Sequence, residues 1–205
     1  SVSKFGDTYY LYGTTDLDYG LERAGTPVVW KSKDFVNWSF EGSHISGFDW
    51  SKGYEYTNDK GEKKKGYFRY WAPGRVIEHD GKFYLYVTFV KPGDKMGTYV
   101  LVADRPEGPF RFTEGKGLFV SGEEVDSPAI INDIDGEPFI DDDGTGYIFW
   151  RRRNAARLSA DRLHLDGEPV TLKTVRQGYS EGPVMFKRKG IYYYIYTLSG
   201  HQNYA

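Results

Sequence analysis

The stretch WAPGRVIEHDGKFYLYVTF, residues 71–89, decides the fold. It contains a short strand, a tight turn and a second strand rich in aromatic residues, which together predict a β-hairpin. The aromatic strand recurs four times along the chain, each time just after Gly or a Gly-containing turn. The copies are DTYYLYGT (7–14), GKFYLYVTF (81–89), GTGYIFW (144–150) and GIYYYIYT (190–197).

Further elements accompany these copies and complete a four-stranded unit. IDGEPFIDDD (134–143) and SEGPVMFKRK (180–189) precede the third and fourth copies, as SVSKFGD precedes the first with its opening residues absent. A strand, a polar turn and an outer strand follow at Val28–Trp38, Val100–Phe112 and, more weakly, Arg157–Gly167. Four-stranded units repeated radially predict a β-propeller. A β-sandwich also uses many short strands, but its strands need not share a motif.

Composition narrows the functional classes. The chain has 205 residues, 18 Tyr, 13 Phe, 5 Trp and 25 Gly, which favours an all-β fold rich in turns. The net charge of −2 gives no basis for binding nucleic acid. No apolar run is long enough for a membrane-spanning helix, and the absence of cysteine excludes disulfides and thiolate metal sites.

Two acidic residues fall at corresponding places in the repeat. Asp135 precedes Gly136 in the third unit, where the second unit has Ala72, and Glu181 lies two positions before Pro183 in the fourth. Because innermost propeller strands line a central channel, both carboxyl groups are expected to approach one axial cavity. Paired carboxyl groups cleave glycosidic bonds. An Asp before Gly is also a common turn residue, and a Glu before Gly-Pro can simply end a strand.

These motifs, in this order, resemble glycoside hydrolase family 43, the inverting β-xylosidases, α-L-arabinofuranosidases and arabinanases. VWKSKDFVNW (29–38) adds a resemblance to an outer-strand motif of that family. The resemblance implies a five-bladed β-propeller acting on pentose-containing oligo- or polysaccharides in xylan and arabinan degradation. It makes Glu181 the general acid, Asp135 the modulator of its pKa, Trp71 a wall of the sugar pocket and Arg75 a further substrate contact.

The sequence departs from the family pattern in two places. The Pro that usually follows the modulator is Gly136, which frees the backbone around Asp135. The family's general base, an Asp in a D-P-S-V context, would lie two residues before Ser1 and is absent. We therefore expect residues 1–205 to form one partial propeller catalytic domain of roughly blades one to four. The first strand of blade one and all of blade five would be missing, and the fragment alone would be inactive.

Other patterns in the sequence give weaker evidence about function. The four histidines have no metal-ligand spacing and are expected at the surface or in turns, although His201 could reach the channel. Asp141-Asp142-Asp143-Gly144 predicts a type I′-like turn rather than a calcium loop. We expect no required cofactor, and the sequence neither supports nor excludes a central calcium ion. Arg151-Arg152-Arg153 are strand-end charges, or one of them faces the cavity.

Three functions remain open from the sequence. The first is an inverting hydrolase that releases arabinofuranosyl or xylosyl units. The second is a propeller that binds glycans without cutting them. The third is a related five-bladed hydrolase acting on fructans or on galactose-containing glycans, because fold alone does not decide the substrate. For location, export from the cell is only weakly favoured.

Overall fold

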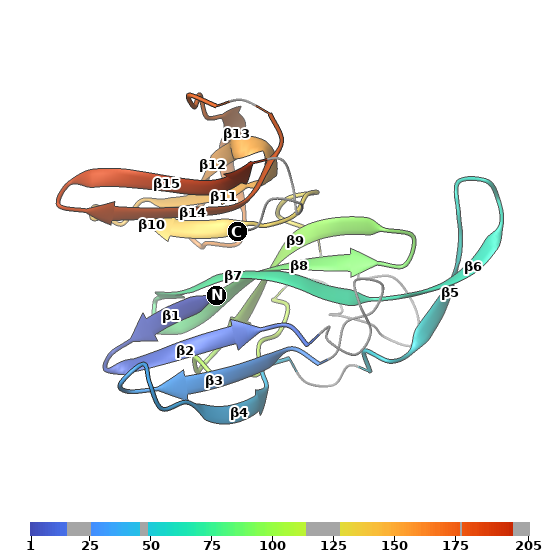
Figure 1. The fold of residues 1–205 in the computed structure, drawn as a ribbon, viewed down its shortest axis with the longest axis horizontal. Coiled ribbons are helices and arrows are strands. Elements are labelled where there is room, and N and C mark those ends of the chain that lie inside the picture. The colour runs from blue at the N-terminus through green and yellow to red at the C-terminus, as the bar shows by residue number, and fades with distance from the viewer. Residues whose placement is uncertain (16–25, 46–48, 114–127, 177, 199–205) are drawn as a thin grey trace.

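The computed structural model describes residues 1–15, 26–45, 49–113, 128–176 and 178–198, and these are almost entirely β-structured (Figure 1). Two sheets have four antiparallel strands each, in sequence order. The first contains β1 (Val2–Phe5), β2 (Thr8–Gly13), β3 (Val28–Ser32) and β4 (Ser39–Ser43). The third contains β10 (Glu137–Ile140), β11 (Gly146–Trp150), β12 (Asn154–Leu158) and β13 (Leu165–Thr171).

The second and fourth sheets contain fewer strands. The second has β7 (Arg69–His79), β8 (Lys82–Lys91) and β9 (Lys95–Ala103), and its predicted outer strand is reduced to a bridge between Val102 and Arg111. The fourth has β14 (Ser180–Arg188) and β15 (Ile191–Leu198). Each sheet therefore contains the predicted hairpin with its aromatic strand.

The sheets are successive blades around a common hub. Their first strands contact one another in order, β1 with β7, β7 with β10 and β10 with β14. This confirms the predicted incomplete propeller. One detail is wrong: we expected the first blade to lack its first strand, whereas Val2–Phe5 forms it and pairs with β2. The described residues contain no fifth blade.

Aromatic and aliphatic side chains fill the interfaces between blades. Strand β8 alternates its residues between two of these interfaces, with Leu85, Val87 and Phe89 facing the first sheet. Tyr84 and Tyr86 face the third sheet. A strand buried on both faces needs no alternation of apolar and polar residues, because neither face meets water. This explains why the repeat appears in the sequence as a continuous apolar run.

Two local expectations need correction. The polar insertion at Thr57–Phe68 is not simply a loop, because β5 (Gly53–Thr57) and β6 (Lys63–Tyr67) pair as a hairpin that projects from the blades (Figure 1). The Asp141–Gly144 turn is not type I′, which needs positive φ at both central residues. Only Gly144 has positive φ there, whereas Asp80-Gly81 and Lys189-Gly190 both satisfy the requirement.

Helical structure in the described part of the chain is limited to one 3₁₀ turn, η2 (Arg151–Arg153), which follows β11 directly. Arg151–Arg153 were expected to be strand-end charges or to include one residue facing the cavity. They turn the chain sharply, with φ values of 64° at Arg152 and 61° at Arg153. No helix among the described residues has the length and apolarity needed to cross a membrane.

Candidate active site

A repeated backbone kink marks the hub end of three blades. Ala72, Asp135 and Gly182 occupy matching positions and have φ values of 37°, 64° and 57°. The pairing register shifts beside two of them, between Trp71 and Pro73 and between Glu181 and Val184. A left-handed backbone costs a residue other than glycine about 1 kcal/mol or more. Such strain at matching places is a feature of functional sites.

A cavity of about 350 Å³ lies at these kinks. All four blades contribute to its lining, which consists of Ser1, Val2, Ala72, Pro73, Gly74, Arg75, Asp135, Glu137, Gly182, Pro183 and Val184. The predicted axial cavity is therefore present, and Asp135 and Arg75 both reach it.

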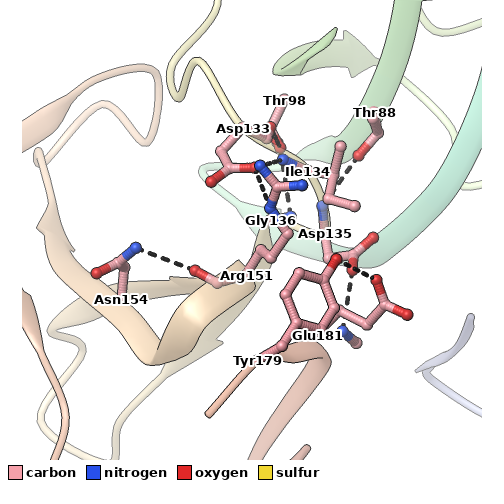
Figure 2. A network of polar contacts seen from close by, with 11 residues as sticks. Thr88, Thr98, Asp133, Ile134, Asp135, Gly136, Arg151, Asn154, Tyr179 and Glu181 are labelled. Carbon is pink, nitrogen blue, oxygen red and sulfur yellow. Dashed lines mark hydrogen bonds and ion pairs between the residues drawn. The ribbon is translucent and has the colours of Figure 1, made fainter. Parts of the chain in front are cut away.

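Asp135 is held by bonds from two other blades. Its backbone N–H donates to Thr88 Oγ1 at 3.1 Å, and its carboxylate Oδ2 accepts from the Gly182 N–H at 2.9 Å (Figure 2). The Asp135 side chain, from the third blade, is thereby hydrogen-bonded to the residue that follows Glu181 in the fourth blade. Sequence reasoning predicted this approach of Asp135 to Glu181, and the structure brings them together.

Gly136 fixes Asp135 more firmly than we expected. Its N–H donates to Thr98 Oγ1 at 3.3 Å, a bond that the usual proline could not make because it has no N–H. A Cβ on Gly136 would lie 2.4 Å from Thr98 Cγ2. A Cβ on Gly74 would lie 2.3 Å from the Gly136 carbonyl oxygen. The second and third blades therefore meet backbone to backbone at this point.

The pKa of the Asp135 carboxyl group reflects both its burial and its charged neighbour. Burial raises the pKa of Asp135, the hydrogen bond from Gly182 opposes this rise, and the negative charge of Glu181 adds to it. Burial and a neighbouring like charge are the two conditions that bring a carboxyl pair into acid–base chemistry.

Glu181 lies beside Asp135 at the start of β14 (Figure 2). Its Oε2 accepts a hydrogen bond from the Tyr179 hydroxyl at 2.8 Å, and its carbonyl accepts one from Thr197 Oγ1 at 2.9 Å. The hydrogen bond from Thr197 in β15 fixes the backbone of Glu181, while the one from Tyr179 fixes one carboxylate oxygen.

The structure separates the two predicted substrate contacts. Arg75 lines the cavity, where its Nε lies 3.4 Å from Glu137 Oε1. Trp71 is not among the lining residues, and the guanidinium of Arg69 lies 4.8 Å from the centre of its ring. The role of Trp71 as a pocket wall therefore stays a prediction, and this cavity does not support it.

Sequence reasoning missed Glu137 and Tyr179. Glu137 is 8% exposed, lines the cavity and accepts a hydrogen bond from the Arg75 N–H at 2.9 Å. Burial raises the pKa of Glu137, and the charge of Arg75 opposes this rise. Each missed residue lies two positions from a predicted acid. This spacing was the signal available, although Asp135 and Tyr179 lie just before β10 and β14 rather than within them.

The remaining candidates do not join the site. His44 was expected near the surface but is completely buried, and its Nε2 lies 2.9 Å from the Tyr70 hydroxyl oxygen. His79 and His164 contact neighbouring aspartates, and His201 lies outside the described residues. In the part of the chain that the structure describes, no group of three or more His, Asp or Glu could hold a metal ion.

Comparison with known proteins agrees with this geometry. The family model "Glycosyl hydrolases family 43" matches residues 1–204. The β-D-galactofuranosidase xynD of Aspergillus niger is 29% identical over 96% of this chain and 54% of its own length. The arabinoxylan arabinofuranohydrolase of Bacillus subtilis is 28% identical over 93% of this chain and 41% of its own length. The chain thus spans about half of these relatives or less.

Solved structures show the same relationship. A glycoside hydrolase with 39% identity matches with a TM-score of 0.76, over 98% of this chain and 42% of that one. The family-43 protein BlXynB from Bacillus licheniformis matches with a TM-score of 0.66 and 26% identity, over 98% of this chain and 36% of its own. The propeller blades and the match along almost the entire sequence lead to one conclusion: this chain belongs to glycosyl hydrolase family 43.

Proposed function

We propose that the full-length protein containing this chain hydrolyses the glycosidic bonds of arabinofuranosyl or xylosyl units in plant polysaccharides, with inversion. Glu181 is the general acid and Asp135 is the residue that keeps it protonated. The observation that carries the proposal is the bond from Gly182 to Asp135, which ties Asp135, in the hub cavity, to the residue next to Glu181. Asp135 and Gly182 line this cavity, whereas Glu181 lies beside them and is not among its lining residues.

The reaction needs three groups. Water attacks the anomeric carbon and gives its proton to a general base, while the bond from that carbon to the leaving oxygen breaks. Glu181 donates its proton to this oxygen and becomes a carboxylate. An ionised Asp135 beside it disfavours a second negative charge, so the proton stays on Glu181 until the leaving oxygen needs it.

We propose that the base comes from the residues preceding Ser1. Ser1 and Val2 line the cavity, so a residue just before them would lie at the same hub. An inverting enzyme needs its base about 6.5–9.5 Å from the acid, with room for water between them. Ser1 and Val2 line the cavity together with Gly182, Pro183 and Val184 of the fourth blade, and this supports such an arrangement.

The test of the acid is Glu181→Gln in the full-length protein. General acid catalysis contributes roughly 10²–10⁴-fold, so kcat/KM should fall by about that factor on glycosides with poor leaving groups. The fall should be much smaller on 4-nitrophenyl glycosides, whose leaving group needs little proton donation. Glu78→Gln, at an exposed position in β7, is the matched control. Equal losses on both kinds of substrate would contradict the assignment.

A second substrate class has a specific observation in its favour. One relative with 29% identity is named a β-D-galactofuranosidase. A panel of 4-nitrophenyl α-L-arabinofuranoside, β-D-xyloside and β-D-galactofuranoside on the full-length protein separates the classes. The pentose proposal expects the largest kcat/KM on one of the first two substrates, and a preference for the third would replace it. Binding of oligosaccharides without turnover of any substrate would favour a glycan-binding propeller.

A further inference from the structure

The residues behind Glu181 form a chain of polar contacts that the proposed mechanism leaves without a role (Figure 2). Tyr179 comes from the segment that leads into β14, and Arg151 comes from η2 of the neighbouring blade. The Tyr179 hydroxyl donates to Glu181 Oε2 at 2.8 Å. Arg151 Nε lies 2.7 Å from Asp133 Oδ1. The first contact lies in the fourth blade and the second in the third, and a hydrogen bond from Arg151 to Tyr179 links them behind the carboxyl group that is expected to lose a proton.

Arg151 also acts on the Tyr179 hydroxyl. Burial raises the pKa of Tyr179 and its hydrogen bond to Glu181 adds to the rise, whereas a hydrogen bond from Arg151 opposes it. An oxygen that accepts from a guanidinium directs its own hydrogen elsewhere. The Tyr179 hydrogen therefore points to Glu181, and the positive charge behind it makes the hydroxyl a stronger donor.

The 3₁₀ turn holds this arrangement in place. The Asn154 side chain donates to the Arg151 carbonyl at 3.0 Å. The buried Arg153 donates from its guanidinium to the Gly178 carbonyl at 2.6 Å, next to Tyr179 in sequence. The left-handed backbone at Arg152 and Arg153 lets one short turn direct two arginines at the same segment. Arg151 and Arg153 thus position the residues before Glu181.

We propose that Tyr179, oriented by Arg151, is a positioning residue that fixes the acid proton on Glu181 Oε1 and stabilises the carboxylate formed when that proton leaves. This inference rests on the proposed role of Glu181. With Oε2 already accepting from Tyr179, the protonated acid carries its hydrogen on the other oxygen. After transfer to the leaving oxygen, the hydrogen bond from Tyr179 becomes charge-assisted and strengthens.

Tyr179 and Asp135 therefore act on Glu181 in opposite senses. Asp135 opposes ionisation of Glu181 by its negative charge, and Tyr179 favours ionisation by hydrogen bonding. The charged and titratable groups around Glu181 include Asp135 and Tyr179, with Arg151 and Asp133 behind them. Removing the Tyr179 hydroxyl takes away one interaction that opposes the repulsion from Asp135.

The test is Tyr179→Phe in the full-length protein, measured beside Glu181→Gln. On a glycoside with a poor leaving group, kcat should fall about tenfold with little change in KM, because one charge-assisted hydrogen bond is lost. The alkaline limb of the kcat–pH profile should move to higher pH by about one unit. On the 4-nitrophenyl glycoside the fall in kcat should be smaller. Arg151→Met should shift the limb in the same direction by less.

Tyr192→Phe is the matched control. Its hydroxyl bonds to Asp141 at the outer turn of the third blade, away from the cavity, so the kcat–pH profile should keep its wild-type form. An unchanged profile in Tyr179→Phe, or equal losses on both substrates with the limb in place, would overturn the inference and leave Glu181 as the acid. If Glu181→Gln itself kept full activity on the poor leaving group, both the proposed function and this inference would fall.

Discussion

Two aspartates at opposite ends of β10 show how one contact between blades serves chemistry and another serves stability. Asp135 lies just before the strand, at the hub, and Asp141 lies just after it, at the outer turn. Both reach the fourth blade. Asp135 meets a backbone N–H and the like charge of Glu181. Asp141 meets Lys187 Nζ at 2.8 Å and the Tyr192 hydroxyl.

The two environments move the carboxyl groups in opposite directions. Burial and Glu181 raise the pKa of Asp135. Hydrogen bonds from Lys187 and Tyr192 lower the pKa of Asp141 to about 2. A pair of blades can thus be joined favourably at its outer turn while its hub holds two carboxyl groups that repel each other. Strain at the hub is retained where reactivity requires it.

The largest effect should come from Asp135→Asn. Loss of the charge lets Glu181 release its proton more readily, so the alkaline limb of the kcat–pH profile should move to lower pH. On a poor leaving group at neutral pH, kcat should fall by about a hundredfold. Steady-state kinetics of the full-length protein measure both effects. Asp141→Asn is the control and should stay within about twofold of wild type; a comparable loss there would remove the distinction between the two ends.

Gly74, at the hub where the second blade meets the third, and Gly144, in the outer turn of the third blade, should differ next. A methyl group on Gly74 meets the Gly136 carbonyl oxygen, so Gly74→Ala should destabilise the fold by roughly 1–3 kcal/mol through overpacking. Gly144 in the outer turn has open space around it and only the strain of φ +83°. Gly144→Ala should therefore cost about 1 kcal/mol. Urea unfolding compares them, and a larger cost at Gly144 would contradict the close approach of blades at the hub.

Asp141→Asn should lower the melting temperature in a pH-dependent way. The folded pKa of Asp141 is depressed, so its contribution to stability is present above the ordinary value of 3.8 and is lost as pH falls toward about 2. The difference between wild type and variant should therefore be full at pH 5–7 and vanish near pH 2. Thermal melts across this range provide the measurement, and a difference that grows on acidification would show that the ion pair is not its source.

The smallest effect should be that of Asp135→Asn on the melting temperature, and its sign should be opposite to that of Asp141→Asn. The folded pKa of Asp135 is raised, so its ionisation costs stability as pH rises past 3.8 and through the folded value. The asparagine oxygen can still accept from Gly182. The variant should melt slightly above wild type at pH 7 and level with it at pH 3. A lower melting point at pH 7 would mean that Asp135 is held favourably as a carboxylate.

Much of the fold was predictable because the interfaces between blades repeat. Aromatic strands such as β8 are apolar on both faces, and their hairpin turns recur with Gly at the same place. The turn at Asp141–Gly144 was predicted as the wrong type, because one glycine in a sequence does not reveal how many turn residues have positive φ. The insertion at Thr57–Phe68 pairs as a hairpin in spite of its lysines, because strand pairing needs backbone groups rather than apolar side chains.

The site was only partly predictable. Asp135 and Glu181 could be located from the repeat, and Arg75 from the family resemblance. The partners that hold them could not, because Thr88, Thr98 and Arg151 come from strands and turns distant in sequence. Tyr179 lies two residues before Glu181, but that spacing alone does not show whether two side chains bond. His44 was misplaced because a histidine that pairs with a buried tyrosine resembles any other histidine in the sequence.

The most direct test of the central claim, that Asp135 and Glu181 act as one unit, is a double-mutant cycle. The full-length wild type, Asp135→Asn, Glu181→Gln and the double variant are compared by kcat/KM on a glycoside with a poor leaving group. Because Asp135 is proposed to act through Glu181, the double variant should be no slower than Glu181→Gln alone. Losses that multiply, so that the double variant is slower by the product of the two single effects, would contradict the account.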